Sequence, residues 1–218
     1  ATTRKERDGE EEETIPPMFF CDDSDVRDQT RVTCATTSPC GKFIAAGSRV
    51  NVATNVAVVR VWEVAVEGRR RIKKQSESLL KLSLHKGEVT SLAFSPCSKF
   101  IASLGGASDN YQLVLWRLAD GKAMCGRNTF GATTVAFVNR ASINPSLVTA
   151  GADESGVLMW QFDSAKRSFS SEKCRLGQIR RDVVKVVVSE NDDFAYLGTK
   201  TGDVLKVSLE GAVSYTHQ

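Results

Sequence analysis

The chain repeats one sequence pattern, and this repeat limits the possible folds more than any other feature does. The string Ser-Pro-Cys-x-Lys-Phe-Ile-Ala occurs twice, at residues 38–45 and 95–102. A strand-like run precedes each copy, and a turn and an apolar run that ends in tryptophan follow it. A small unit that recurs in this way cannot bury its apolar face alone, so neighbouring copies have to stack. The sequence therefore predicts an array of similar small sheets.

The best-defined copy covers residues 82–116. It predicts three short strands separated by turns rich in glycine, proline and asparagine: 89–94, 100–103 and 113–116. Proline fixes φ and lacks a backbone donor, so Pro96 marks the turn between the first two strands. Because side chains alternate along a strand, Val89 is expected on the same face as Ser91 and Ala93.

Tryptophan ends three of the copies. Trp62, Trp116 and Trp160 are spaced by 54 and 44 residues, and a WD40 repeat is about 40–45 residues long. An insertion at 68–75 accounts for the longer first interval. A fourth, eroded copy has Val207 where tryptophan is expected. The sequence thus predicts an all-β, WD40-type β-propeller with about four readable blades, at about 31–83, 84–127, 130–175 and 181–216.

The number of copies suggests an incomplete ring. WD40 rings most often have seven blades, which need roughly 290 residues, and this chain has 218. We expect a fragment of a longer chain, or a partial ring whose open sheet edges are covered by a partner. The charged residues 1–28 are expected to form a flexible arm, or alternatively to become ordered against a partner. The partial propeller is expected to occupy 29–218.

Four residues of the best-defined copy form a candidate structural site. His85, Ser103, Asp109 and Trp116 occupy the approximate positions of the hydrogen-bonded tetrad that resemblance to WD40 repeats suggests. In such a tetrad the histidine links serine to aspartate, and the serine hydroxyl satisfies the buried indole N–H. A catalytic His-Asp-Ser set is the alternative, but only one copy has these residues and no cleft is evident for a nucleophile. The blade cores are expected to contain Trp62 and Trp160.

Composition and missing motifs argue against several functional classes. The formal net charge of +3 and the pI of about 8.5 are too mild for a nucleic-acid-binding surface. No apolar run approaches the roughly 18 residues of a membrane span. The six cysteines form no Cys-x-x-Cys pair and are expected to be reduced thiols. Because nucleotide-binding, zinc-protease and hydrolase motifs are absent, we expect no enzyme activity, no cofactor, no metal and no small-molecule substrate.

A basic insertion follows the first copy. It contains five cationic residues within six positions: Arg69, Arg70, Arg71, Lys73 and Lys74. This cluster is a candidate partner-binding loop, because it could bind an acidic surface. The alternative is an exposed hairpin loop kept in solution by its charge.

Several stretches are more specific than a generic WD40 repeat. Among them are Leu-Ser-Leu-His-Lys at 82–86, Gly-Gln-Ile-Arg-Arg at 177–181 and Tyr-Leu-Gly-Thr-Lys-Thr-Gly-Asp-Val-Leu-Lys at 196–206. Together they resemble the family of cilia- and flagella-associated protein 52, a ciliary WD-repeat protein, over about residues 78–210. The resemblance implies a longer chain with two propellers inside the doublet microtubules of the axoneme, bound to tubulin and neighbouring axonemal proteins. It implies no contact residues that can be transferred to this chain.

Two functions follow as hypotheses. The first is a non-catalytic structural protein of the cytoskeleton in cilia and flagella, which binds tubulin and stabilises doublet microtubules. Tubulin's acidic surface would then favour the basic loop. The second is a soluble WD40 adaptor that presents a peptide-binding face in a ubiquitin-ligase or signalling complex. Resistance to detergent extraction with microtubules would distinguish the first from the second.

Overall fold

Four antiparallel sheets make up the computed structural model, which describes residues 19–20, 31–51, 54–64, 74–75, 78–140, 144–152, 156–174, 176 and 180–209. The first sheet has the order β2 (Val32–Thr37), β3 (Phe43–Ser48), β4 (Ala57–Glu63) and β6 (Leu80–His85). The second sheet has the order β7 (Val89–Phe94), β8 (Phe100–Gly105), β9 (Gln112–Arg117) and β10 (Ala123–Asn128).

The third and fourth sheets continue the same meander. The third sheet has the order β11 (Ala132–Phe137), β12 (Ser146–Gly151), β13 (Val157–Asp163) and β14 (Ser168–Lys173). The fourth sheet has three strands, β15 (Val183–Val188), β16 (Phe194–Thr199) and β17 (Val204–Ser208). The end of the predicted fourth blade, after residue 209, lies outside the described residues.

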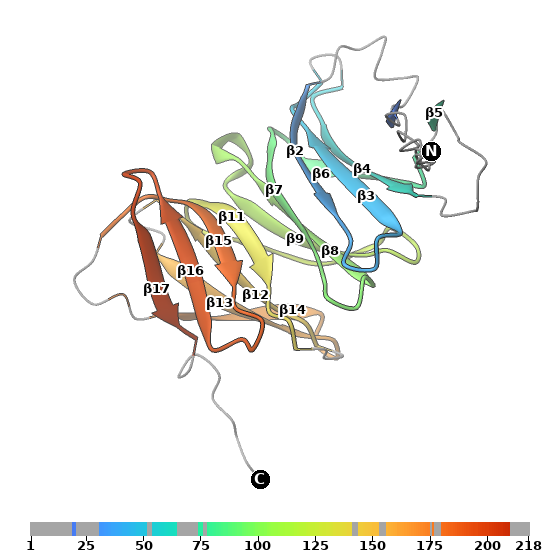
Figure 1. Ribbon diagram of the computed structural model, residues 1–218. Helices are drawn as coiled ribbons and strands as arrows, with labels where there is room; N and C mark the ends of the chain where they lie inside the picture. Colours follow the sequence, from blue (N-terminus) through green and yellow to red (C-terminus); the bar gives the residue numbers. More distant parts are fainter. Residues whose placement is uncertain are drawn as a thin grey trace, which may run out of the picture.

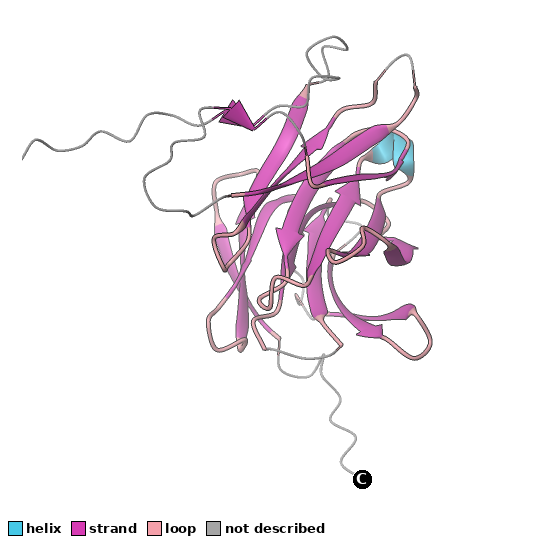
Figure 2. Ribbon diagram, turned by 90° about the vertical axis from the view of Figure 1, so that its right-hand side faces the viewer, coloured by secondary structure: helices cyan, strands magenta, loops and turns pink. Residues whose placement is uncertain are grey.

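The sheets fan out in chain order, with the first strand of each on the inside of the arc (Figure 1). The inner strand β7 contacts β2 and β11, and β11 contacts β15. Within the described residues the sheets do not close a ring. The prediction of an all-β, partial WD40-type propeller is therefore confirmed. Among the described residues, the only helix is the 3₁₀ turn η1 (Ala107–Asp109), shown in cyan in Figure 2, and nothing there is long or apolar enough to be a membrane-spanning helix.

One turn geometry closes the first hairpin of three sheets. In each turn the serine amide donates to the carbonyl of the phenylalanine five residues later, and the phenylalanine amide donates to the serine Oγ. The three pairs are Ser38–Phe43, Ser95–Phe100 and Ser189–Phe194. A left-handed residue occupies the third position after each serine: Gly41 (φ 71°), Ser98 (φ 52°) and Asp192 (φ 64°). The third turn lacks the Pro-Cys pair, so the serine and phenylalanine are sufficient to define this geometry.

Each inner strand contains a β-bulge near its start. The register against the next strand shifts after the first residue of β2, β7, β11 and β15. In β7 the extra residue turns Val89 toward the first sheet, where it packs with Leu92 and Phe94. The prediction that Val89 shares a face with Ser91 and Ala93 is therefore wrong, because a bulge interrupts simple alternation.

Residues just after the bulge link neighbouring inner strands. The amide of Val135 donates to Ser91 Oγ (3.2 Å), and the amide of Val186 donates to Thr134 Oγ1 (3.3 Å). These bonds give buried polar groups partners across the inter-sheet gap, which fixes the position of one sheet against the next.

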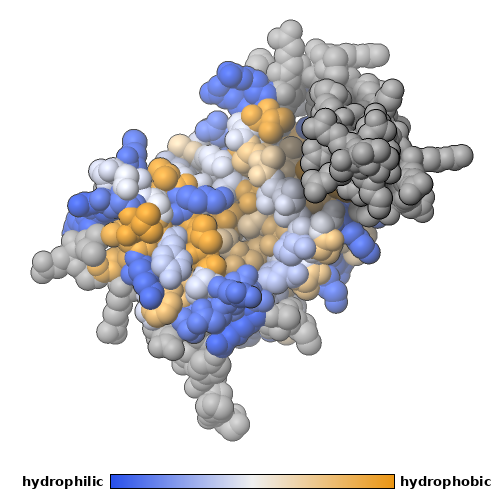
Figure 3. Space-filling view, viewed as in Figure 1, coloured by the Kyte–Doolittle hydropathy of each residue, from blue (hydrophilic) through white to orange (hydrophobic). Residues whose placement is uncertain are grey.

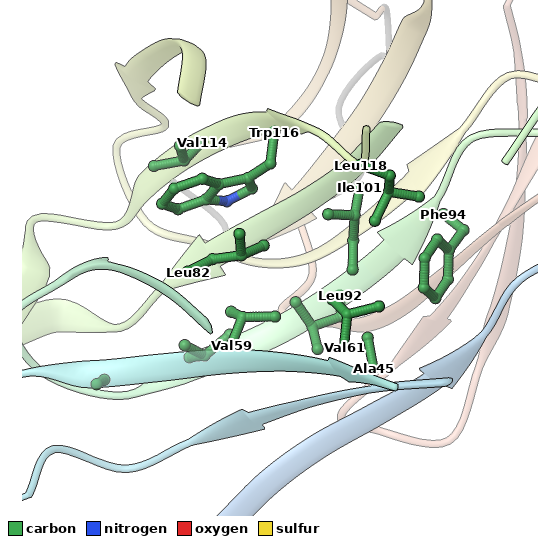
Figure 4. Close-up of a cluster of buried hydrophobic side chains, with 12 residues drawn as sticks. Ala45, Val59, Val61, Leu82, Leu92, Phe94, Ile101, Val114, Trp116 and Leu118 are labelled. Carbon is green, nitrogen blue, oxygen red and sulfur yellow. The ribbon is translucent and has the colours of Figure 1, made fainter. Parts of the chain in front are cut away.

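The hydrophobic core lies between the sheets and not within any one of them. Figure 4 shows the cluster between the first two sheets, where Trp116, Ile101 and Leu92 face Leu82 and Val59. Equivalent clusters join the second sheet to the third and the third to the fourth. Because burying a Leu- or Ile-sized side chain contributes about 1.5–3 kcal/mol, each sheet depends on its neighbour for much of its stability.

The outward face of the fourth sheet has no neighbour among the described residues. Val187, Tyr196 and Val204 are 53%, 40% and 71% exposed there. Figure 3 shows these strands carrying hydrophobic residues next to hydrophilic ones. The lysine at position 206 lies over the ring of Phe194, with its Nζ 3.6 Å from the ring centroid. This face is therefore partly apolar, as expected for a surface on which another sheet or a partner can pack.

The predicted N-terminal arm, residues 1–28, lies outside the described residues except for 19–20. These two form β1 (Phe19–Phe20), which pairs in parallel with β5 (Lys74–Gln75) from the insertion. The predicted boundary between the first two blades also differs from the structure. Leu84 and His85 belong to β6, because the outer strand continues pairing with β4 up to His85 opposite Ala57.

Candidate functional site

The four candidate tetrad residues meet at the junction of the first two sheets. His85 ends β6 of the first sheet, whereas Ser103, Asp109 and Trp116 come from β8, η1 and β9. His85 Nε2 lies 2.7 Å from Ser103 Oγ, and Trp116 Nε1 donates to the same Oγ at 2.7 Å. His85 Nδ1 contacts Asp109 Oδ2, and the amide of Lys86 donates to Asp109 Oδ1 at 3.1 Å. The chain of contacts thus runs from one sheet into the next.

Burial determines the protonation state of this network. The side chain of His85 is fully buried, and this burial lowers the pKa of His85 below its ordinary value of 6.5, although Asp109 opposes the shift. A neutral imidazole donates from Nδ1 to Asp109 and accepts the Ser103 hydroxyl proton at Nε2. Ser103 Oγ is then free to accept the indole N–H, so every buried polar side-chain group of the tetrad has a partner.

The arrangement cannot support nucleophilic catalysis. Ser103 and His85 are both fully buried. A serine nucleophile has to reach a substrate carbonyl or phosphorus atom, which a 0% exposed hydroxyl cannot do. Within the described residues there is also no group of three or more potential metal ligands. The tetrad instead fastens the outer strand of one sheet to the turn and third strand of the next.

Gly105 makes room for the tetrad. A Cβ built on Gly105 would lie 2.8 Å from His85 Nδ1 and closer still to Asp109 Oδ2. Both distances are shorter than the separations that Cβ atoms have from their neighbours in proteins. Any side chain at this position would therefore displace His85 or Asp109. The glycine at the end of β8 therefore has a steric role.

The three tryptophans have different hydrogen-bonding environments. Trp160 Nε1 donates to Thr149 Oγ1 at 2.8 Å, in the same way that Trp116 donates to Ser103. Trp62 Nε1 is buried and has no hydrogen-bond partner, because Ala46 occupies the position of Ser103 and Thr149 in the first sheet. Although no sheet precedes the first one among the described residues, Trp62 is only 4% exposed, and the centroid of the Phe20 ring lies 6.2 Å from that of Trp62.

The predicted basic loop lies almost entirely outside the described residues. Arg69, Arg70, Arg71 and Lys73 lie outside the described residues, and Lys74 is described only as part of β5.

Among the described cysteines none forms a disulfide. Burial raises the pKa of Cys125 to about 12 and that of Cys174 to about 11, as expected for thiols that pack as small apolar groups.

Comparison with protein-family models identifies one matched repeat. The family described as WD domain, G-beta repeat, matches residues 76–117, which include all four tetrad residues. Among solved structures, a chain of the Mitotic Checkpoint Complex aligns with a TM-score of 0.62 at 16% identity, covering 82% of this chain and 49% of that chain. The Cps50 (Swd1) β-propeller domain of Myceliophteria thermophila gives 0.62 at 17% identity, with coverages of 84% and 55%. The chain is therefore a WD40-repeat protein with a β-propeller fold.

Sequence similarity to individual proteins gives a narrower class than the WD40 repeat alone. Cilia- and flagella-associated protein 52 of Chlamydomonas reinhardtii is 35% identical over 183 residues, and the Sus scrofa and Homo sapiens proteins are each 34% identical over 182 residues. The alignments cover 81–83% of this chain but only 27% of each relative. The chain is therefore similar to the cilia- and flagella-associated WD-repeat proteins, as the sequence motifs indicated, and spans about a quarter of the length of these relatives.

Proposed function

We propose that this chain is part of a non-catalytic structural protein of the ciliary axoneme, which binds tubulin and neighbouring proteins and stabilises doublet microtubules. The observation that carries the proposal is the similarity to cilia- and flagella-associated protein 52 over four-fifths of the chain. A buried tetrad with a structural role agrees with a scaffold function.

The physical basis of this function is a rigid set of sheets with fixed spacing. Buried clusters and inter-strand hydrogen bonds hold the sheets together, so loops at their ends keep a constant separation. Such a scaffold can contact a regular lattice at several points at once, which raises its residence time without strong individual contacts. The basic loop at 69–74 would contact an acidic surface such as that of tubulin.

The experiment is cosedimentation of the purified chain with microtubules over a range of salt concentrations. Glutamate substitution of Arg69, Arg70 and Arg71 is expected to weaken binding by about tenfold or more at low salt, and less at high salt, because exposed charges are screened. The control variant carries glutamate at three exposed lysines elsewhere: Lys99, Lys173 and Lys200. Both triple variants change the formal net charge from +3 to −3, so they differ only in where the charge lies.

Comparison of the loop variant with the control variant separates a specific contact of the basic loop from attraction by net charge. Equal weakening of binding in both would indicate attraction by net charge and would remove the basic loop from the proposal. Absence of salt-dependent binding by the unmodified chain would contradict direct tubulin contact. Detergent extraction of cilia tests the cellular role independently, since an adaptor of the signalling type would leave with the soluble fraction while an axonemal protein would stay with the microtubules.

A further inference from the structure

Two turns from neighbouring sheets meet at Cys40. The β2–β3 turn carries Ser-Pro-Cys at 38–40, and the β7–β8 turn carries the same string at 95–97, at the same end of the sheets (Figure 1). Cys40 is exposed, and so are the residues on either side of it. A Cβ built on Gly41 would meet nothing within 4 Å, so the space beside this thiol is open to a small reagent.

The first turn supplies one hydrogen-bond donor to the sulfur. Ser38 Oγ lies 3.3 Å from Cys40 Sγ and accepts a hydrogen bond from the amide of Phe43 at 2.9 Å. Because this buried hydroxyl already accepts from an amide, its own proton can point to the sulfur. Ser95 and Cys97 repeat the contact in the second turn at 3.4 Å, so it does not by itself distinguish the two thiols.

The second turn supplies another donor, from across the gap between the sheets. Ser98 Oγ is buried and, among the described residues, has no hydrogen-bond partner other than Cys40. Asp192 occupies the matching position in the fourth sheet, and its carboxylate accepts the amides of Asn139 (2.6 Å) and Arg140 (2.7 Å) in the third sheet. Arg140 matches Cys40, since each is the third residue after its inner strand. A side chain at this turn position therefore reaches back to the preceding sheet, and in the second sheet it reaches the cysteine.

These contacts favour the ionised form of the thiol. Hydrogen bonds from Ser38, from Ser98 and from a backbone amide lower the pKa of Cys40 from its ordinary value of 9.0 to about 7. Within the part of the chain that the structure describes, no charged side chain contributes to this shift. Burial instead raises the pKa of Cys125 and Cys174. Cys40 thus combines access to solvent with a large thiolate fraction at neutral pH, which is what a reactive thiol requires.

We propose that Cys40 is a site of reversible thiolation by small-molecule disulfides. Its thiolate attacks one sulfur of a disulfide RSSR, the S–S bond of the reagent breaks, a mixed disulfide between Cys40 and one RS group forms, and the other half leaves as the thiolate RS⁻. The disulfide is itself the oxidant, so no further reagent is needed, and an excess of thiol reverses the exchange. Ser98 acts by its hydrogen bond to the thiolate and takes no part in the bond exchange. Neither the basic loop nor the tetrad is involved, so the site is independent of the proposed contact with tubulin.

The test uses bis(2-hydroxyethyl) disulfide, which carries no charge at any pH used, on the purified chain. Samples are quenched with acid and digested, and mass spectrometry gives the rate of adduct formation at Cys40 and at Cys97 separately. At pH 7 about half of Cys40 is ionised in the fold, compared with about 1% of a thiol with a pKa of 9.0. Lowering the pKa by about two units also makes the thiolate about six to ten times less nucleophilic. Cys40 should therefore react about five to eight times faster in the folded chain than in the chain unfolded by urea.

The order of the two rates should reverse at pH 9. Cys40 is then almost fully ionised in the folded chain and about half ionised in the unfolded chain, so the less nucleophilic folded form reacts about three to five times more slowly. A difference in accessibility alone would have the same direction at both pH values. Rates that do not change order between pH 7 and pH 9 would therefore overturn the proposal.

One variant removes the second donor. Ser98→Gly suits the left-handed backbone at this position (φ 52°), as Gly41 does at the matching position of the first sheet. It should raise the pH at which the Cys40 rate is half-maximal and slow the reaction of Cys40 at pH 7 about twofold, with a smaller effect on Cys97.

The matched control removes an exposed charge from the same turn. Lys99→Gln should leave the pH profile of Cys40 unchanged, because hydrogen bonds and not charged side chains lower the pKa of this thiol. Thermal unfolding verifies that both variants are folded. The proposal is also overturned if Cys40 reacts no faster than Cys97 in the unmodified fold at pH 7, or if Ser98→Gly and Lys99→Gln give the same pH profile.

Discussion

Replacing Ser103 by alanine should strongly destabilise the protein, because it removes a hydroxyl that serves two buried nitrogens. Its Oγ contacts both His85 Nε2 and Trp116 Nε1 at 2.7 Å, and the residues carrying these nitrogens are 0% and 3% exposed. Alanine leaves both nitrogens buried without a partner. An orphaned buried polar group costs about 1–3 kcal/mol, so the loss expected for two of them is about 2–6 kcal/mol. That is a large fraction of the roughly 5–15 kcal/mol by which domains are stable.

Urea unfolding followed by tryptophan fluorescence measures this loss. Thr149→Ala is the matched comparison, because it orphans only the Trp160 indole and should cost about 1–3 kcal/mol, half the loss expected for Ser103→Ala. The double variant His85→Ala, Ser103→Ala should lose less than the sum of the single variants, since the two residues share one network. A Ser103→Ala protein whose free energy of unfolding lies within about 0.5 kcal/mol of the unmodified value would show that the buried network does not stabilise the fold.

Three further changes test the same reasoning. Ala46→Ser should stabilise the protein by about 0.5–1.5 kcal/mol, because it gives the buried Trp62 indole an acceptor; no gain in urea midpoint would mean that the hydroxyl does not reach Nε1. Gly105→Ala should cost about 2 kcal/mol or more by displacing the tetrad, and an unchanged thermal midpoint would contradict the steric role of the glycine. Acidification should also destabilise the protein, because burial lowers the pKa of His85 in the folded state. Below about pH 6.5 the unfolded chain therefore binds more protons than the folded chain does. The stability that is present above that pH is lost as the pH falls toward the pKa of His85 in the folded state. His85→Gln should flatten this dependence in urea titrations while a glutamine at His217, the only other histidine, should leave it intact.

The repeat in the sequence was sufficient to predict the fold class and to select the tetrad residues. Tryptophan at regular intervals and the twice-occurring Ser-Pro-Cys string indicated stacked sheets, because a repeated unit of this size has to bury its face on a copy of itself. Thr149 was missed although the repeat held the signal, since it aligns with Ser103 in the third copy. The unpaired indole of Trp62 could have been inferred in the same way from Ala46.

Tertiary structure decided how the units connect. The sequence suggested that His85 begins the second blade, but pairing with β4 makes it the end of the first sheet, and the tetrad therefore joins two sheets. The bulge that reverses the orientation of Val89 leaves no mark in local composition, because it depends on which strand pairs with which. Local patterns determine which faces are apolar, whereas contacts between distant segments determine which groups end up opposite one another.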